Sequence, residues 1–143
     1  LNGVSGSVAD IRFMHTVILT PDNKRITIPN SHITSNHIIN YSAENVRRVD
    51  FNFSISYSDN IEKAKSVIKE TALTTEFILK DPAPVVYVQS HEASSINLTA
   101  RVWCAVDKYW DVYFAMQENV KLALDKNDIN IPFNQLDVHI INK

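Results

Sequence analysis

Hydrophobic and polar residues alternate most regularly in the segment RVDFNFSISY, residues 48–57. Every second residue is apolar, which is the period of a strand with one buried face. The segment therefore predicts a half-buried strand. The residues expected on its core face are Val49, Phe51, Phe53, Ile55 and Tyr57.

Two later segments have the spacing of amphipathic helices. Asp59 and Glu62 predict a start for the first helix that resembles a capping box, and Asn127-Asp128 predicts the end of the second. The apolar stripe of the first helix is Ile61, Ala64, Val67, Ile68 and Ala72. The stripe of the second is Val112, Tyr113, Met116, Val120, Ala123 and Leu124.

Further strands are predicted between and after these helices. DPAPVVYV begins a strand, because Pro82 and Pro84 cannot continue a helix. SSINLTARVWCAV alternates through Ile96, Leu98, Ala100, Val102 and Cys104. INI and LDVHII are predicted as the last two short strands. Residues 47–131 then follow the order strand, helix, strand, strand, helix, strand, which is that of a ferredoxin-like α/β layer.

The first part of the chain has a different pattern. Residues 8–28 are extended apart from a turn at residues 21–23, which predicts a small all-β unit ending near Ser42. A unit of about 42 residues is near the lower size limit for independent stability, so we expect it to depend on other surfaces. Asn2-Gly3 is a strong hairpin signal without a strand before it. With no initiator Met, we interpret the sequence as a piece of a longer protein.

Composition narrows the function classes. The chain has 143 residues, 45% hydrophobic, a formal net charge of -2 and one cysteine, which is an ordinary soluble globular composition. It contains neither the ~20 apolar residues that span a bilayer nor a signal peptide. A single thiol favours a reducing compartment. The near-neutral charge argues against a nucleic-acid surface, which needs a basic patch.

The candidate chemical groups do not form a catalytic or metal site. Ser31 and His32 are sequence neighbours, which rarely face one another as nucleophile and base. His32 and His37 lie five residues apart with no cysteine or carboxylate close by, so the spacing does not suit a metal. Cys104 alternates with core positions and is interpreted as a buried small apolar residue.

The remaining polar and aromatic groups have structural interpretations. We interpret Asp59 and Glu62 as cap carboxylates rather than an acid/base pair, and His91-Glu92 as an exposed turn. The aromatic residues of segment 109–114 fall on a helix, whereas ferredoxin-like RNA binders carry aromatic residues on the sheet. Both glycines lie in the first six residues, so no glycine-rich phosphate loop exists. The sequence thus predicts no enzyme activity and no cofactor or metal.

Several strings, in order, resemble the family of small-conductance mechanosensitive channels, MscS. They are ITIPNS, NHIINYS, VRRVDFNFSISY, LKDPAPVVYV, SSINLTARVW, DVYFAMQENVKLALDKNDINIPF and QLDVHI. The resemblance covers essentially the whole chain. It implies a homoheptameric channel of the bacterial inner membrane that opens under tension and releases ions and small solutes on hypo-osmotic shock. This chain resembles its cytoplasmic cage, and the membrane helices lie outside it.

The resemblance also implies an α+β domain order. Residues 1–43 are expected to form a small all-β (SH3/Sm-like) domain, and residues 44–133 a ferredoxin-like α/β domain. Residues 134–143 are expected to give one strand to an intersubunit β-barrel. Asn36 and Asn45 stand where related sequences often carry Gly and Pro, and Asp128 where Gly is common. Asn and Asp tolerate left-handed or turn conformations, so the fold is expected to be unchanged.

The resemblance assigns two groups of candidate residues. Openings in the cage wall are expected near the junction of the domains, where Glu44, Arg47 and Arg48 are candidates to line a portal and set the field on passing ions. Solvent-exposed ion pairs are the alternative interpretation of these residues. The candidates for contacts between subunits are Ile33, Ile38 and Ile39 at the corner and Leu136, Val138 and Ile140 inside the barrel.

A second function class stays open at this point. Small β-barrels and ferredoxin-like layers also occur in soluble oligomeric binding modules, including modules that bind RNA, and fold alone does not fix function.

Overall fold

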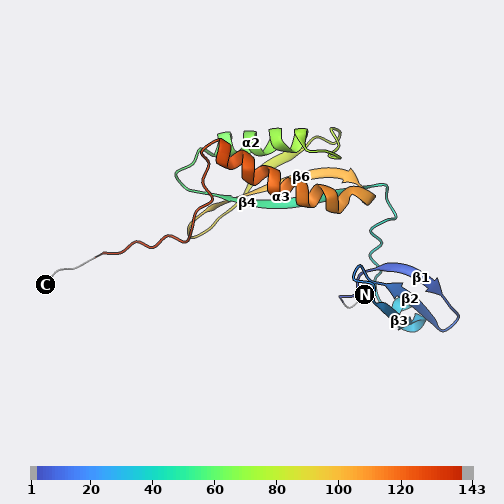
Figure 1. Ribbon diagram of the computed structural model, residues 1–143. Coiled ribbons are helices and arrows are strands. Elements are labelled where there is room, and N and C mark those ends of the chain that lie inside the picture. Colours follow the sequence, from blue (N-terminus) through green and yellow to red (C-terminus); the bar gives the residue numbers. More distant parts are fainter. Residues whose placement is uncertain (1–2, 140–143) are drawn as a thin grey trace. The chain divides into compact units, whose positions relative to one another are not determined.

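A computed structural model describes residues 3–139 and shows a mixed α/β chain with two separate sheets (Figure 1). The chain divides into two compact units, residues 1–43 and residues 44–143. Each unit has its own sheet and is described by itself.

The first unit is a three-stranded antiparallel sheet followed by a short helix. Its strands β1 (Ser7–Ile11), β2 (His15–Leu19) and β3 (Arg25–Pro29) lie in sequence order. The central strand β2 buries Thr16, Val17 and Ile18, while β1 is exposed along its length. The helix α1 (Asn30–Thr34) buries no residue. This unit therefore has a very small core.

The prediction of one extended segment before residue 21 was wrong, because the chain reverses at residues 12–14. The backbone N–H of Arg12 donates to the carbonyl of His15 at 2.8 Å. The side-chain amide of Asn30 donates to the carbonyls of Arg12 and Phe13 at 2.8 and 3.0 Å, and its oxygen accepts from Thr16 Oγ1 at 2.8 Å. A side chain some 17 residues away thus stabilises a turn that contains neither Gly nor Pro.

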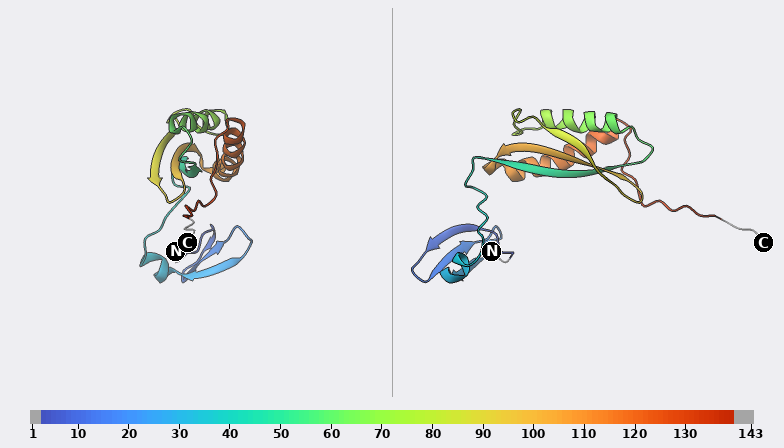
Figure 2. Two further views of the ribbon diagram at one scale, coloured as in Figure 1. Left: turned by 90° about the vertical axis from the view of Figure 1, so that its left-hand side faces the viewer. Right: turned by 180° about the vertical axis from the view of Figure 1, so that it is seen from behind.

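The second unit is one antiparallel sheet with two helices on one face (Figure 2). Its elements are β4 (Val46–Ile55), α2 (Ile61–Thr74), β5 (Val85–His91), β6 (Ile96–Ala105), the 3-10 turn η1 (Val106–Lys108) and α3 (Tyr109–Lys126). The strand order is β4-β6-β5. Helices α2 and α3 pack on each other and on this sheet, and the opposite face of the sheet carries the alternate, mostly polar residues.

The predicted core faces of this unit are confirmed. The buried residues from β4, β6 and the two helices form one cluster: Val49, Phe51, Phe53, Ile55, Ile96, Leu98, Ala100, Val102, Cys104, Ala64, Val67, Ile68, Ala72, Val112, Met116, Val120 and Leu124. Tyr57 is the exception. Strand β4 ends at Ile55, and Tyr57 is 53% exposed with its hydroxyl donating to the carbonyl of Glu92 at 2.6 Å.

The residue that caps the N-terminus of α2 differs from the prediction. The N-cap is Asn60, whose Oδ1 accepts from the backbone N–H of Lys63 at 2.9 Å. Asp59 instead accepts from the N–H groups of Ser56 and Asn130 at 3.3 and 2.8 Å. Its carboxylate therefore ties the end of β4 to the segment that follows α3.

The segment after α3 contains no strand within the described residues. Asn127 ends the helix, and Asp128 has φ 54°, a left-handed conformation of the kind expected at this position. The predicted strand at residues 129–131 was wrong. The backbone bond that this segment accepts, from Ser56 N–H to the Asn130 carbonyl at 3.0 Å, reaches the residue just after β4 and forms no ladder. Residues 136–139 also form no strand in the single chain. Ile140 and Ile141, which complete LDVHII, and Asn2 lie outside the described residues.

Two leucines on α3 test this account of the core. Leu124→Ala removes a fully buried side chain, so we expect the free energy of unfolding to fall by about 2–5 kcal/mol. Leu122→Ala, at a 60% exposed position of the same helix, should change it by no more than about 0.5 kcal/mol.

Urea titration followed by tryptophan fluorescence measures both changes, because Trp103 and Trp110 both lie in the second unit. Equal effects of the two substitutions would contradict the assigned helix face.

Candidate functional site

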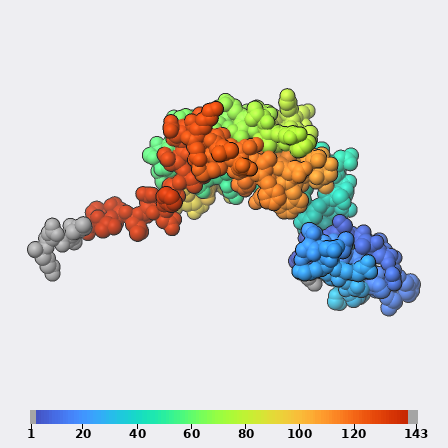
Figure 3. All heavy atoms as spheres, viewed as in Figure 1, coloured from blue at the N-terminus to red at the C-terminus, as the bar shows by residue number. Residues whose placement is uncertain are grey.

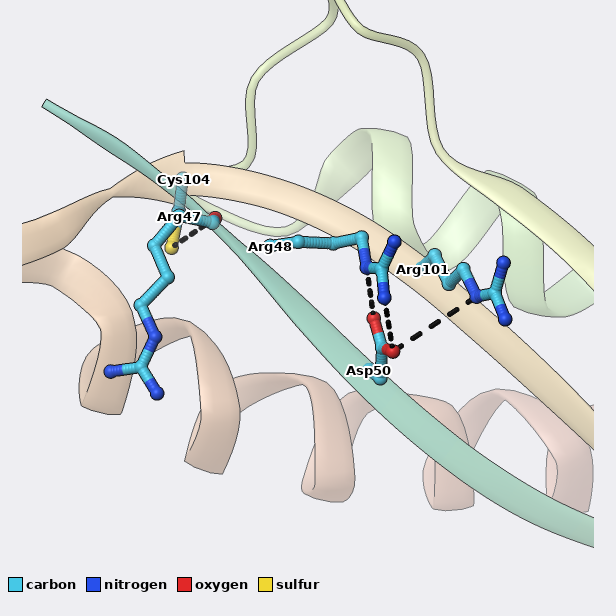
Figure 4. A network of polar contacts seen from close by, with 5 residues as sticks. All are labelled: Arg47, Arg48, Asp50, Arg101 and Cys104. Carbon is cyan, nitrogen blue, oxygen red and sulfur yellow. Dashed lines mark hydrogen bonds and ion pairs between the residues drawn. The ribbon is translucent and has the colours of Figure 1, made fainter. Parts of the chain in front are cut away.

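Arg47 and Arg48 are adjacent in sequence but lie on opposite faces of β4 (Figure 4). Arg47 is on the helix side, with its guanidinium carbon 3.8 Å from the centroid of the Tyr109 ring. Its backbone carbonyl accepts a weak hydrogen bond from Cys104 Sγ at 3.8 Å. Arg47 is therefore held against α3 rather than grouped with Arg48.

Arg48 belongs to a charged group on the open face of the sheet. Its Nε and Nη2 donate to Asp50 Oδ1 and Oδ2 at 2.7 and 2.9 Å. From the neighbouring strand β6, Arg101 Nε approaches Asp50 Oδ2 at 4.0 Å. All three side chains are close to half exposed, at 46%, 45% and 44%, so solvent limits the pairing to about 0–1 kcal/mol. One carboxylate shared by two arginines leaves this face with excess positive charge.

Sequence reasoning missed Asp50 as the partner of Arg48, and Arg101 as the second arginine beside Asp50. The alternation of β4 already placed Asp50 on the same face as Arg48. The position of Arg101 required the register, in which Asp50 is opposite Arg101. Both the portal and the exposed-ion-pair interpretations remain compatible with Arg48.

Glu44, the third portal candidate, is an exposed residue at the start of the second unit. The carbonyl of the next residue, Asn45, accepts from the N–H of Val106 at 3.2 Å. This bond anchors the backbone just before β4 begins. The backbone next to Glu44 is therefore held in place, although the Glu44 side chain itself is exposed to solvent.

The three candidate isoleucines of the first unit line one hollow of about 540 Å³. Ile33 lies on α1, and Ile38 and Ile39 follow it, with 64% of each of these two side chains exposed. Val8 and Ile11 of β1 line the hollow as well. The corner isoleucines thus gather around one hollow, where Ile38 and Ile39 remain mostly exposed.

More apolar surface of the first unit is uncovered at the turn between β1 and β2. Phe13 is 95% exposed and Met14 70%. Contiguous apolar surface of this kind marks contact sites in proteins more often than solvent-facing surface. The first unit therefore presents both a hollow and an apolar turn to its surroundings.

The candidate barrel residues are also uncovered. Leu136 is 90% exposed and Val138 73%, while Ile140 lies outside the described residues. The segment extends away from α3, as Figure 3 shows, and is anchored by the N–H of Gln135, which donates to Ser94 Oγ at 3.1 Å. Beyond this anchor, Leu136 and Val138 pack against little in their own chain.

Aromatic residues cluster at the start of α3, on a helix as predicted. The rings of Trp110 and Phe114 stack with centroids 5.8 Å apart, and they are 62% and 64% exposed. Tyr109 and Tyr113 pack against the core from the same turns. The outer pair therefore forms an exposed aromatic surface on the helix.

Cys104 lies in the core of the second unit, as predicted. It is fully buried, and this burial raises the pKa of its thiol, a shift that the nearby Arg47 charge partly offsets. The proton is thus held more tightly than in water, which disfavours the nucleophilic thiolate.

Neither a membrane-crossing helix nor a metal-ligating cluster is found among residues 3–139. Among the described helices, none has both the length and the apolar character to cross a membrane. In the same residues, His, Cys, Asp and Glu side chains do not gather in threes that could hold a metal ion.

Comparison with known proteins gives matches along the whole chain. The model of the mechanosensitive ion channel β-domain matches residues 1–43, and that of the mechanosensitive ion channel MscS C-terminal region matches residues 49–131. A small-conductance mechanosensitive channel of Edwardsiella ictaluri is 39% identical over 140 residues, covering 98% of this chain and 49% of the relative. One from Helicobacter pylori is 32% identical over 144 residues, covering 100% and 53%.

The solved structures agree with these sequence matches. The crystal structure of Helicobacter pylori MscS in its closed state has a TM-score of 0.93 and 31% identity, covering 99% of this chain and 56% of that one. Arabidopsis thaliana MSL1, at 19% identity and a TM-score of 0.74 over 92% of this chain and 50% of that one, shares the fold. This chain spans about half the length of the curated relatives it matches.

Cys104 gives a direct check of the buried strand face. We expect a maleimide to label it slowly in the folded chain even as the pH passes about 8.5, where an exposed thiol ionises, because burial keeps its pKa higher. In a Cys104→Ala background, Gln89→Cys, at an exposed position of the neighbouring strand β5, should label quickly. Mass spectrometry of a pH series measures both rates, and equally fast labelling of the two thiols would mean that Cys104 is accessible.

Proposed function

Because the chain belongs to the MscS family of mechanosensitive ion channels, we propose that it forms the cytoplasmic vestibule of a tension-gated channel. In this proposal the channel releases ions and small solutes on hypo-osmotic shock. The observation that carries it is the match of both family models, in order, to the two units of the chain. The 0.93 TM-score to Helicobacter pylori MscS supports it over 99% of the chain.

The proposal places the chain on the cytoplasmic face of a bacterial inner membrane. Membrane helices from outside this sequence would anchor it there. The 49% and 53% coverage of the curated relatives leaves room for such a membrane domain.

Assembly into a homo-oligomeric ring, with seven copies as the family resemblance implies, is part of the proposal. Its support is the uncovered apolar surface of the single chain, which includes Phe13, Ile38, Ile39 and Leu136. A closed ring of identical copies can cover such surfaces and pair the edges of a small sheet.

We also assign a fold type to each part of the chain, on the basis of its membership of the family. The order β4-β6-β5 is that of a ferredoxin-like layer without its fourth strand. The first unit is assigned as part of an SH3/Sm-like β-domain, and residues 134–143 as one strand of an intersubunit barrel. An isolated strand has unpaired backbone groups, which explains why residues 136–139 are irregular in a single copy.

The permeation role is assigned to Glu44 and Arg48, near the start of the second unit. Both are exposed at the beginning of the second unit, where a charge can act on a passing ion through water. Arg47 fits a structural role better, because its guanidinium stacks on Tyr109.

A catalytic function has no support from these matches, since the family is a channel family rather than an enzyme class. The soluble RNA-binding module, the alternative left by the sequence, also gains nothing from the comparisons. We therefore propose neither a cofactor nor a nucleic-acid partner.

Patch recording of the full-length protein in membranes that lack other mechanosensitive channels tests the function. Suction on the patch should open discrete currents, and expression should improve survival of hypo-osmotic shock. Patches with abundant protein and no tension-dependent current would refute the channel proposal.

The portal assignment predicts different effects for neighbouring residues. In an ion gradient, Arg48→Glu should shift the reversal potential towards the equilibrium potential of the cation. Glu44→Gln should shift it towards the equilibrium potential of the anion. Arg47→Glu should mainly lower stability, because a carboxylate would replace the cation over the Tyr109 ring. The same reversal potential in all four proteins would return Glu44 and Arg48 to the exposed-ion-pair interpretation.

The barrel assignment predicts that Val138→Asp weakens the ring. The substitution would bring several like charges together at a narrow, poorly hydrated axis. Asp137→Asn, at the adjacent outward position, is the matched control and should leave the assembly unchanged. Native mass and thermal stability report the difference, and an unaltered Val138→Asp assembly would mean that Val138 does not point inward.

A further inference from the structure

Two faces of the second unit carry residues that are characteristic of protein interfaces but have few contacts in their own chain. One is the outer face of α3, and the other is the open face of the sheet, on the side away from both helices (Figure 2). Trp, Tyr and Arg are the residue types enriched at the centres of interfaces. The outer face of α3 carries Trp110, and the open sheet face carries arginines and a tyrosine. The two faces differ in charge.

The outer face of α3 is aromatic and acidic. Trp110 and Phe114 stack on each other and are mostly exposed. Asp111, Glu118 and Asp125 recur every seven residues, so they lie along one line of the helix. Asp111 pairs with Lys108 at 3.3 Å and Asp125 pairs with Lys121.

Glu118 stands apart from its two acidic neighbours on this line. Among residues 3–139 it has neither an ion pair nor a hydrogen bond from its side chain, and it is exposed. The middle of the acidic line is therefore available to a cation from outside the chain.

The open sheet face is aromatic and basic. Arg48 holds Asp50 in a bidentate pair, and Arg101 reaches the same carboxylate only at 4.0 Å. Trp103 lies opposite Arg48 in the register, and Tyr87, which is 53% exposed, lies on the same face of the neighbouring strand β5. Arg101 thus has donor groups to spare, next to aromatic rings.

We infer that the outer face of α3 in one copy docks on the open sheet face of the next copy, with Glu118 facing Arg101. A carboxylate without a partner and an arginine with an incomplete one are complementary, and Trp110 and Phe114 can cover the planar guanidinium group of Arg101. The helix layer of each copy then covers the part of its neighbour's open sheet face around Arg101, and Arg48, near the start of β4, stays at the edge of the contact, where it can still line a portal.

This contact joins two different faces, so each copy offers one of each to a different neighbour. Such heterologous contacts generate closed rings when the rotation between copies closes. A contact of α3 with α3 would instead oppose two acidic lines, and a contact of sheet with sheet would oppose two positive faces. The inference rests on the proposed ring and specifies which surfaces form it.

Chemical crosslinking of the full-length protein tests the contact. Every variant carries Cys104→Ala, so that only introduced thiols react. Glu118→Cys and Arg101→Cys in the same chain, treated with a short bis-maleimide, should give a ladder of crosslinked copies up to the complete ring on a denaturing gel. Each single cysteine alone should give monomers, because like positions do not meet.

Glu70→Cys on α2 combined with Arg101→Cys is the matched control and should give no ladder, since Glu70 is exposed on the other helix. Native mass is measured on each preparation before crosslinking. A ring that yields no ladder from positions 101 and 118 overturns this inference and leaves the proposed function standing. Dimers from either single cysteine would also overturn it, in favour of a symmetric contact. A monomeric native mass would contradict both the inference and the proposed ring.

Discussion

The second unit depends on the register between β4 and β6, which pairs ten residues from Val46 opposite Ala105 to Ile55 opposite Ile96. A slip of one residue would exchange the faces of the strand. With the observed register, Phe51 and Ala100 meet on the core side, while Asp50 and Arg101 meet on the open side. The same alternation separates Arg47 from Arg48, and it explains why one arginine stacks on a helix and the other belongs to a charged surface.

A single copy of the chain forms this strand pairing, but several of its surfaces stay exposed to solvent. In the first unit, a sheet whose outer strand β1 is fully exposed encloses almost no core, which agrees with the limited stability expected of so few residues. In the second unit, the sheet has one face without helices. These features have one physical explanation in common, which is that other copies of the chain complete the structure.

Strong periodicity made much of the fold predictable from the sequence. The core faces of β4, β6, α2 and α3 follow from alternation or helical spacing, because burial on one face dictates both.

The turn at residues 12–14 was not predictable, since Asn30 stabilises it from a distant position. Asp59 was assigned to a helix start, whereas its carboxylate reaches Asn130, a contact that only the folded chain creates. The strands expected near the end of the chain lack partners within one copy. Among the candidate site residues, Arg47 and Arg48 are adjacent in sequence and were predicted as one basic pair. The alternation of the strand instead places them on opposite faces of the sheet.

The native mass of the full-length protein, extracted in mild detergent and measured by mass spectrometry, tests the central claim that identical copies complete this structure. The account predicts a single closed ring, with seven copies as the family resemblance implies, that persists on dilution. A protein that is active as a tension-gated channel but has the mass of one copy would contradict it.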